Sequence, residues 1–216
     1  MQLQINAVKE AAPQRAAIET RGLTKRYRSM VALDGCTITV PRGRISALIG
    51  HNGAGKTTLL RILCGLARPD HGSVSVLGHA PGQADTGFLA EVGFLAQDIP
   101  LYRRLTAEDH IAVGAHANVR FDAKSVRTRM RSLGIPLDRA VGKLSGGQRA
   151  QLALALTLAK KPRLLLLDEP VAALDPLARS QFLTALTEAV AGQDLTFLMS
   201  SVWPTNSSSF RTCDRS

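Results

Sequence analysis

The sequence predicts an α/β fold in which helices alternate with the strands of a mainly parallel sheet. Four consecutive leucines at 164–167 form a short apolar run, which is typical of a strand buried on both faces of such a sheet. A glycine-rich loop at 50–55 separates a β-prone run from an amphipathic helical pattern. Strand, loop and helix in this order form the repeating unit of a parallel sheet, so both observations indicate the same class.

The composition fits one globular domain, with 216 residues, a mass of 23.1 kDa and 45% apolar residues. The first thirty residues lack the apolar centre of a signal peptide, and no apolar run reaches the length of a membrane span. We therefore expect a chain that reaches a membrane only through a partner. Cys36, Cys64 and Cys213 have neither paired nor metal-ligand spacing, which indicates a reducing compartment.

The formal net charge of +10 raises the question of nucleic acid. Arginines gather at 21–28 and at 120–131, but without interleaved aromatic residues or a recognised nucleic-acid-binding motif. A solvated basic face is therefore favoured over nucleic-acid binding, and an anionic membrane surface would also suit the charge.

The strands are predicted from short β-prone runs between turn residues. Residues 1–17 are expected to form a loose polar segment, and a turn at 27–29 separates the first two strands. The predicted strands lie at 18–23, 32–40, 44–50, 72–78, 92–96, 164–167 and 195–200.

Helices are predicted from apolar periodicity and from capping residues. One helix follows the glycine-rich loop at 57–64, and another covers 175–190. Helices dominate from Thr106 to about residue 159, with starts at Thr106 and Asp122 and a break at 134–136.

The glycine-rich loop carries the first chemical signal. Residues 50–57 fit the phosphate-binding pattern G-x-x-x-x-G-K-[ST], and the flanking strand and helix are the context that this pattern requires. Backbone amides of 53–58 would wrap a β-phosphate at the helix N-terminus, Lys56 would reach the β and γ oxygens, and the Thr57 hydroxyl would ligate Mg²⁺. The alternative is an ordinary strand-to-helix turn with an accidental Lys-Thr.

An acidic pair follows the leucine run. Asp168 lies at the carboxyl end of the predicted strand, where open α/β sheets bind ligands. Its carboxylate could hold Mg²⁺ through water, while Glu169 orients or deprotonates an attacking water. The alternative is that Asp-Glu-Pro merely ends a strand.

A second glycine-rich stretch, Leu-Ser-Gly-Gly-Gln at 144–148, precedes a predicted helix at 149–159. Ser145 and the amides of Gly146 and Gly147 would form another anion site at a helix N-terminus. One γ-phosphate hardly needs two such sites in a single subunit, so the second is expected to cover nucleotide held by another copy in a head-to-tail dimer. An ordinary serine N-cap is the alternative.

Together these residues resemble the nucleotide-binding subunit of ABC transporters over residues 18–201. Residues 50–57 match the Walker A loop, 144–148 the signature sequence and 164–168 the Walker B strand, with Glu169 as the catalytic carboxylate. The other matching positions are Ala173–Asp175 as the D-loop, Gln97 as the Q-loop glutamine and Tyr27 as the aromatic residue that stacks on adenine.

The resemblance assigns site residues by position. Those expected to bind nucleotide are Tyr27, Gly50, Asn52, Gly53, Ala54, Gly55, Lys56, Thr57, Thr58, Ser145, Gly146, Gly147, Gln148 and Asp175. Thr57, Gln97 and Asp168 are expected to hold magnesium, and Glu169 and Gln97 to take part in catalysis.

The resemblance also implies an ABC-type P-loop NTPase fold. A mixed sheet core would carry an N-terminal antiparallel β subdomain and an inserted helical subdomain at about 105–150. ATP and Mg²⁺ would bind between two such subunits, in a homodimer or with a paired ATP-binding subunit. Closure would push on a transmembrane permease docked at 99–105, and hydrolysis would reopen the dimer.

The implied location is cytoplasmic, on the inner face of the cell membrane, with no nucleic acid as partner. The residues around 99–105 look most like those of drug-exporter and related ABC-2 type subunits. A soluble ABC protein acting on nucleic acid is an alternative suggested by the +10 charge, but the sequence has neither a coiled-coil insertion nor a second phosphate loop.

One position departs from the family pattern. The family places a histidine after the strand that follows the D-loop helix, whereas Val202 occupies that position and no histidine follows Asp168. The Ser- and Thr-rich residues 202–216 lead us to expect an altered or truncated C-terminus, such as a shifted reading frame would give. The alternatives are a degenerate subunit paired with a competent partner, or a regulatory module that closes on ATP without hydrolysis.

Overall fold

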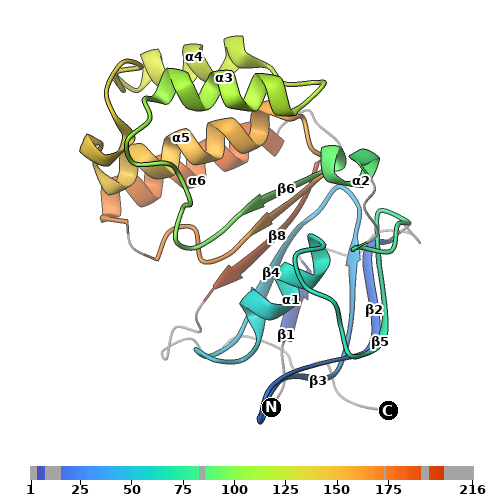
Figure 1. Cartoon of the computed structure of the whole chain (residues 1–216). Coiled ribbons are helices and arrows are strands. Elements are labelled where there is room, and N and C mark those ends of the chain that lie inside the picture. The colour runs from blue at the N-terminus through green and yellow to red at the C-terminus, as the bar shows by residue number, and fades with distance from the viewer. Residues whose placement is uncertain (1–3, 8–15, 83–85, 173, 191–194, 202–216) are drawn as a thin grey trace.

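The fold is described from a computed structural model of the chain (Figure 1). The structure describes residues 4–7, 16–82, 86–172, 174–190 and 195–201. Strands and helices alternate along most of this length, which confirms the predicted α/β class.

A five-stranded sheet forms the centre, with the strand order β1-β4-β8-β7-β6. Its members are β1 (Gln4–Ala7), β4 (Ile45–Ile49), β6 (Val92–Leu95), β7 (Leu164–Leu167) and β8 (Thr196–Ser201). The strands β4, β8, β7 and β6 run parallel, and β1 is antiparallel to β4. The carboxyl ends of the four parallel strands therefore meet at one edge.

A second sheet is antiparallel and has the order β3-β2-β5. It consists of β2 (Ala16–Tyr27), β3 (Met30–Pro41) and β5 (His71–Val76). A turn at 28–29 joins β2 to β3, as predicted. This sheet corresponds to the antiparallel subdomain that the family resemblance implies.

The helices occupy two sides of the central sheet (Figure 1). The helix α1 (Lys56–Leu63) lies between the two sheets, while α3 and α4 lie over α5 and α6. The remaining helices are α2 (Thr86–Glu91), α3 (Ala107–Ala117), α4 (Ala123–Ser132), the short 3-10 helix Val141–Lys143, α5 (Gly146–Ala159) and α6 (Pro176–Val190).

The leucines of β7 divide between two hydrophobic cores. Leu164 and Leu166 pack with residues of α1 and the antiparallel sheet, whereas Leu165 and Leu167 pack with residues of α5 and α6. All four are fully buried. The prediction of a strand buried on both faces is therefore confirmed.

A third core lies within the helical region and joins α3, α4 and α5. Because α5 also contributes to the core beneath it, this helix connects the helical region to the central sheet. The predicted subdomain boundary near residue 150 falls inside α5.

The predicted helix starts are confirmed by their caps. The Thr106 side chain accepts a hydrogen bond from the Asp109 amide, and the Asp109 carboxylate accepts one from the Thr106 amide. Asp122 caps α4 by accepting from the Ser125 amide. A side chain at the N-cap satisfies an amide that the helix itself leaves unpaired.

One prediction about local structure was wrong, and one helix was not predicted. Residues 1–17 were expected to be loose, but β1 pairs with β4 over residues 4–7 and β2 begins at Ala16. The open edge of β4 explains this, because its unpaired amides and carbonyls offer bonds to a neighbouring strand. The helix α2 was not predicted, since six residues are too few to show helical periodicity.

Two of the cysteines lie in the described part of the chain. Cys64 is buried in the core around α1, as expected for a small apolar side chain, and burial raises the pKa of its thiol. Burial likewise raises the pKa of the half-buried Cys36 thiol. Cys213 lies outside the described residues.

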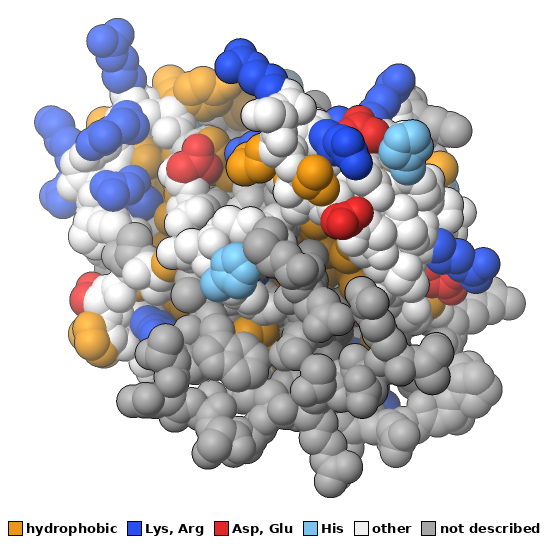
Figure 2. Space-filling view, turned by 90° about the horizontal axis from the view of Figure 1, so that it is seen from below, with side chains coloured by type: hydrophobic (Ala, Val, Ile, Leu, Met, Phe, Trp, Pro, Cys, Tyr) orange, Lys and Arg blue, Asp and Glu red, His pale blue; other side chains and the backbone are white. Residues whose placement is uncertain are grey.

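No helix in the described ranges has the length and hydrophobicity that crossing a membrane requires. Positive charge is uneven on the face seen in Figure 2, where Lys and Arg side chains gather at the left. The helices α3 to α6 lie on that side in Figure 1.

Candidate functional site

The glycine-rich loop connects the end of β4 to the start of α1, at the edge where the parallel strands end. Gly55 caps α1 in the left-handed conformation, with φ near +86°. A Cβ atom on Gly55 would lie 2.2 Å from the carbonyl oxygen of Ala32 in β3. Only glycine fits this position, so the loop is held tightly against the antiparallel sheet.

Lys56 is buried, although its charge would favour solvent. Its side chain is only 4% exposed, and Nζ donates hydrogen bonds to the carbonyl oxygens of Gly50 at 2.8 Å and His51 at 3.1 Å. Nζ also lies 3.2 Å from Oε1 of Glu169. The loop carbonyls and this carboxylate together replace water around the ammonium group.

The Walker B residues lie beside this lysine. Asp168 is almost fully buried, and its Oδ1 accepts a hydrogen bond of 2.8 Å from Oγ of Ser200. The same Oγ accepts a 2.9 Å bond from the amide of Glu169. Ser200 therefore fixes both the carboxylate of Asp168 and the backbone of Glu169.

Ser200 was not identified in the sequence. It is in β8, which runs beside β7, with Leu167 aligned with Met199 in parallel register. The sequence predicts a strand that ends on this serine, but the periodicity of one strand does not reveal its neighbour. Its place opposite Asp168 follows only from the strand order.

Glu169 has a left-handed backbone conformation, with φ of +45°. Such a conformation is costly for a residue with a side chain, and structures keep it where neighbouring groups enforce it. Here its amide is bonded to Ser200, and its Oε2 accepts a long hydrogen bond of 3.5 Å from Nε2 of Gln97. The structure thus brings Lys56, Gln97 and Glu169 together from three separate segments.

The residues expected to hold Mg²⁺ have suitable donor atoms. Thr57 offers a hydroxyl, Asp168 a carboxylate and Gln97 an amide carbonyl, and Mg²⁺ prefers such oxygen ligands together with those of a phosphate. The bond from Ser200 fixes Oδ1 of Asp168, which directly follows β7. The donor set therefore fits this ion, and its binding stays a prediction.

The signature sequence forms the N-terminus of α5. Ser145 caps this helix, accepting from the Gln148 amide at 3.1 Å, while the Ser145 amide donates to Oε1 of Gln148 at 3.0 Å. A Cβ atom on Gly147 would lie 2.7 Å from Cβ of Ala178. A glycine here lets the first turn of α5 approach α6.

A cavity of about 370 Å³ opens beside the signature sequence. Its walls include Ser145, Gly147, Gln148 and Asp175, so the signature and the end of the D-loop share one hollow. Asp175 also caps α6 by accepting a 2.9 Å bond from the Ala178 amide. The phosphate loop lines no part of this cavity, so the two glycine-rich stretches are separate features of the surface.

Tyr27 lies at the tip of the β2–β3 hairpin, paired with Met30. Tyr27 is 40% exposed, and Nζ of Lys25 stands 5.4 Å from the centre of its ring. Because Ala32 on the same hairpin contacts Gly55, the hairpin tip lies near the phosphate loop. The exposed ring is available for stacking on a base.

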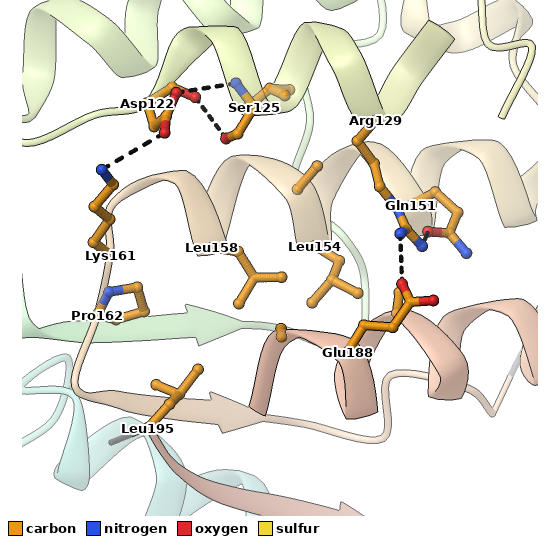
Figure 3. Close-up of a pocket in the computed structure, with 14 residues that line it drawn as sticks. Asp122, Ser125, Arg129, Gln151, Leu154, Leu158, Lys161, Pro162, Glu188 and Leu195 are labelled. Atoms are coloured by element: carbon orange, nitrogen blue, oxygen red, sulfur yellow. Dashed lines mark hydrogen bonds and ion pairs between the residues drawn. The ribbon is translucent and has the colours of Figure 1, made fainter. Parts of the chain in front are cut away.

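Another cavity, of about 560 Å³, lies between α4, α5 and α6 (Figure 3). Its floor is apolar, and Leu154, Leu158 and Leu195 point into it. Arg129 at its rim is 3.1 Å from Oε2 of Glu188 and donates to Oε1 of Gln151 at 3.4 Å. None of the predicted nucleotide, metal or catalytic residues lines it. This cavity is therefore not part of the predicted site.

Two positions that were compared with the family motifs lie outside the described residues. These are Ala173 of the D-loop and Val202, which occupies the place of the family histidine. Their roles stay predictions.

The family comparison agrees with the motifs. The sequence profile of the ABC transporter family matches residues 33–172, which include the phosphate loop, the signature sequence and the acidic pair. The chain belongs to the ABC transporter family. The resemblance predicted from the sequence is thereby confirmed.

Curated relatives of this ABC protein are named as ATP-binding proteins of several transport systems. The sulfate/thiosulfate import ATP-binding protein CysA of Bradyrhizobium diazoefficiens is 42% identical, over 76% of this chain and 50% of its own. The probable multidrug ABC transporter ATP-binding protein YbhF of Escherichia coli is 38% identical, over 86% of this chain and 33% of its own. The phosphonates import ATP-binding protein PhnC 1 of Natronomonas pharaonis is 36% identical, over 82% of this chain and 79% of its own.

The chain thus spans half or less of the length of CysA and YbhF.

Solved structures confirm the ABC fold. An ATP-binding subunit of an ABC transporter superimposes with a TM-score of 0.74 and 25% identity, over 85% of this chain and 79% of that one. The cbiO1 protein from Clostridium perfringens gives 0.70 and 26%, over 87% and 78%.

Proposed function

We propose that this ABC protein binds Mg-ATP between two copies, or between itself and a paired ATP-binding subunit, and hydrolyses it to drive a transmembrane permease. The observation that carries the proposal is the contact of 3.2 Å between Lys56 of the phosphate loop and Glu169. It puts a phosphate-binding cation and a candidate general base in one place. Two separate motifs of the sequence thereby supply one reaction centre.

Binding would begin with an exchange of partners at Lys56. Its ammonium group is held by two loop carbonyls and Glu169, and a triphosphate offers it stronger, charge-assisted hydrogen bonds. The free amides at the start of α1 add favourable dipoles for an anion. As Lys56 turns to the phosphates, Glu169 loses its cation and becomes free to accept a proton.

Hydrolysis would use the released carboxylate as a base. Glu169 accepts a proton from water. Gln97 orients that water, since its Nε2 already lies 3.5 Å from Oε2 of Glu169. Asp168, held by its bond from Ser200, would bind magnesium together with Thr57. Bound Mg²⁺ neutralises part of the charge on the phosphates. Lys56 and Thr57 come from the phosphate loop and α1. The other residues in this mechanism lie at or just after the ends of β6, β7 and β8.

The signature sequence would complete the site of the other copy. Ser145 and the amides of Gly146 and Gly147 lie at a helix N-terminus that opens to the surface. An anion presented by a second subunit fits this end of α5. The shared hollow with Asp175 supports a surface at which two copies meet.

The segment 99–105 is the proposed docking surface for the permease, on the inner face of the membrane. Ile99 and Leu101 are half-buried, while Tyr102 is 71% exposed. This mixture of apolar and polar contact suits a transient interface. Under the same proposal, the ABC-2 resemblance of the sequence favours a permease that exports drugs.

The test compares ATP turnover of the purified chain with that of Glu169→Gln, with Glu188→Gln as control. Glu188 is an exposed carboxylate on α6 that pairs with Arg129, so its change leaves the phosphate loop intact. We expect Glu169→Gln to lower turnover by at least about a hundredfold while ATP still binds, since that is the usual contribution of a general base. The control should turn over normally.

Equal background rates of ATP turnover in the parent and in Glu169→Gln would overturn the proposed ATPase activity. A module that closes on ATP without hydrolysis would then be favoured, for which Val202 in place of the family histidine is the sequence observation. Co-purification of the parent with an integral membrane protein would support the transport role. A tagged chain extracted from membranes without such a protein would contradict it.

A further inference from the structure

One residue, Asp70, ties the tip of the β2–β3 hairpin to the start of β5. Its backbone amide donates to the carbonyl oxygen of Thr24 at 2.9 Å. Its carboxylate accepts a 2.6 Å bond from the Arg26 amide and a 2.9 Å bond from Nζ of Lys25. Asp70 thus bonds to three consecutive residues of β2, the last of which directly precedes Tyr27.

Lys25 extends this connection from the backbone to the ring of Tyr27. Its side chain is only 16% exposed, and Nζ lies over the ring, 5.4 Å from the ring centre. A lysine ammonium at such a distance is attracted to the face of an aromatic ring. Because Nζ also pairs with Asp70, the cation is held on one side of the ring, and a base would stack on the other side.

The Asp70 carboxylate is ionised at neutral pH. The hydrogen bond from Lys25, followed by the bond from the Arg26 amide, lowers the pKa of this carboxyl. Since the Asp70 side chain is 37% exposed, solvent screens its ion pair with Lys25. We therefore expect the pair to fix the geometry of the hairpin tip more than to stabilise the fold.

We propose that Asp70 and Lys25 are positioning residues for nucleotide binding, which act through Tyr27 and set where the base stacks. This inference rests on the proposed function, because it takes the phosphate loop as the site of the triphosphate. The Ala32 carbonyl of β3 leaves no room for a side chain on Gly55, so the same hairpin adjoins that loop. A nucleotide joins its base to its phosphates over a limited length, and a hairpin tip that is already in place lowers the cost of binding both.

The experiment measures the affinity of the full chain for Mg-ATP and for Mg-tripolyphosphate by isothermal calorimetry. Tripolyphosphate has the phosphates without the base and sugar, so the ratio of the two affinities reports what those groups contribute. We expect the parent to bind ATP at least about tenfold more tightly, because a base stacked on an aromatic side chain contributes about that much. A role of Asp70 in sheet stability alone is the competing explanation, and it would weaken both ligands alike.

Two variants remove the connection in steps. Asp70→Ala removes the acceptor of Lys25 and of the Arg26 amide, and we expect it to lower the affinity ratio about fivefold. Lys25→Met removes the cation from the ring and leaves the bond between Asp70 and the Arg26 amide in place, so we expect a decrease of about twofold to threefold. Tyr27→Ala should lower the ratio at least as much as either variant. A change in net charge affects both anions in the same direction, so the ratio largely cancels it.

Asp122→Ala is the matched control. Asp122 likewise accepts from a backbone amide, that of Ser125, and pairs with a lysine, since its Oδ2 lies 3.6 Å from Nζ of Lys161. Because these contacts lie in the helical region, the control should keep the affinity ratio of the parent.

Three outcomes would count against the positioning role. A parental ratio in both Asp70→Ala and Lys25→Met would mean that Tyr27 needs no support from them. An equal loss of ATP and tripolyphosphate binding in Asp70→Ala would mean that Asp70 only stabilises the fold. A ratio near one in the parent, or no change in Tyr27→Ala, would mean that the base does not bind at Tyr27. Failure of the parent to bind either ligand is distinguishable from all three, since it would overturn the proposed function itself.

Discussion

The two glycine-rich stretches have opposite relations to their own subunit. The phosphate loop is closed: Lys56 is 4% exposed and has three oxygen partners from the same chain. The signature sequence is open: Ser145 is exposed and lines a cavity with Asp175. The difference indicates that the first must exchange internal partners for a ligand, whereas the second is already arranged to face a ligand brought from outside.

Their supports differ as well. The phosphate loop leaves β4 and enters α1, between the central sheet and the antiparallel sheet, where the Ala32 carbonyl leaves no room for a side chain on Gly55. The signature sequence begins α5, which packs on α6 below and on α3 and α4 above. A change at the phosphate loop should therefore affect binding within one subunit, and a change at the signature should affect assembly.

The largest effect is expected from Lys56→Ala. Losing charge-assisted bonds to phosphate should weaken ATP binding by about a hundredfold, measured by isothermal calorimetry. Lys160→Met is the matched control, since Nζ of Lys160 also donates to two carbonyls, of Leu89 and Val92, but far from the loop in sequence. If Lys56→Ala bound ATP as tightly as the parent, the closed loop would not be the phosphate site.

An intermediate effect is expected from Ser145→Ala. It should lower ATP-dependent dimerisation, followed by analytical ultracentrifugation with Glu169→Gln as background, by about tenfold, while ATP binding to the monomer stays unchanged. Loss of the cap should also cost about 1 kcal/mol of unfolding free energy.

Thr106→Ala is the control for this change. It removes the equivalent cap from α3, where Asp109 takes the place of Gln148, and should cost similar stability without affecting dimerisation. Equal dimerisation losses in the two variants would mean that helix stability, and not the signature hydroxyl, determines assembly.

The smallest effect is expected from pH. Hydrogen bonds lower the pKa of three carboxyls in the helical region: Arg127 donates to Glu108, the Thr106 side chain to Asp109 and the Ser125 amide to Asp122. Because these pKa values are lower in the folded state, the ionised carboxyls stabilise the fold at any pH above their unfolded-state pKa values. This contribution to stability is lost as the pH falls through the folded-state pKa values, below about pH 4.

Hydrogen exchange of α3 and α4 measured at decreasing pH would check this expectation. Protection in these helices should decrease as the carboxyls become protonated, and Asp109→Asn should weaken the dependence by removing one titrating group. Protection that stays constant down to about pH 3, roughly one unit below the ordinary Asp and Glu values, would contradict it.

The sequence predicted most elements that carry the site, because capping residues and apolar runs are local signals. Thr106, Asp122 and the leucines of β7 show this. The contacts that link the site were less accessible. The bond from Ser200 to Asp168 requires that β8 lie beside β7, and the Lys56–Glu169 pair joins motifs more than a hundred residues apart. Strand order, which no single segment encodes, creates both.

The two faces of β7 have a mechanical consequence. Since alternate leucines are locked into separate cores, the strand cannot slide with one layer and leave the other in place. A load on α5 and α6 must therefore either reach Asp168 and Glu169 as a displacement or be absorbed by deforming the layer around α1. The two carboxylates at the end of β7 would therefore move when either half of the molecule is deformed.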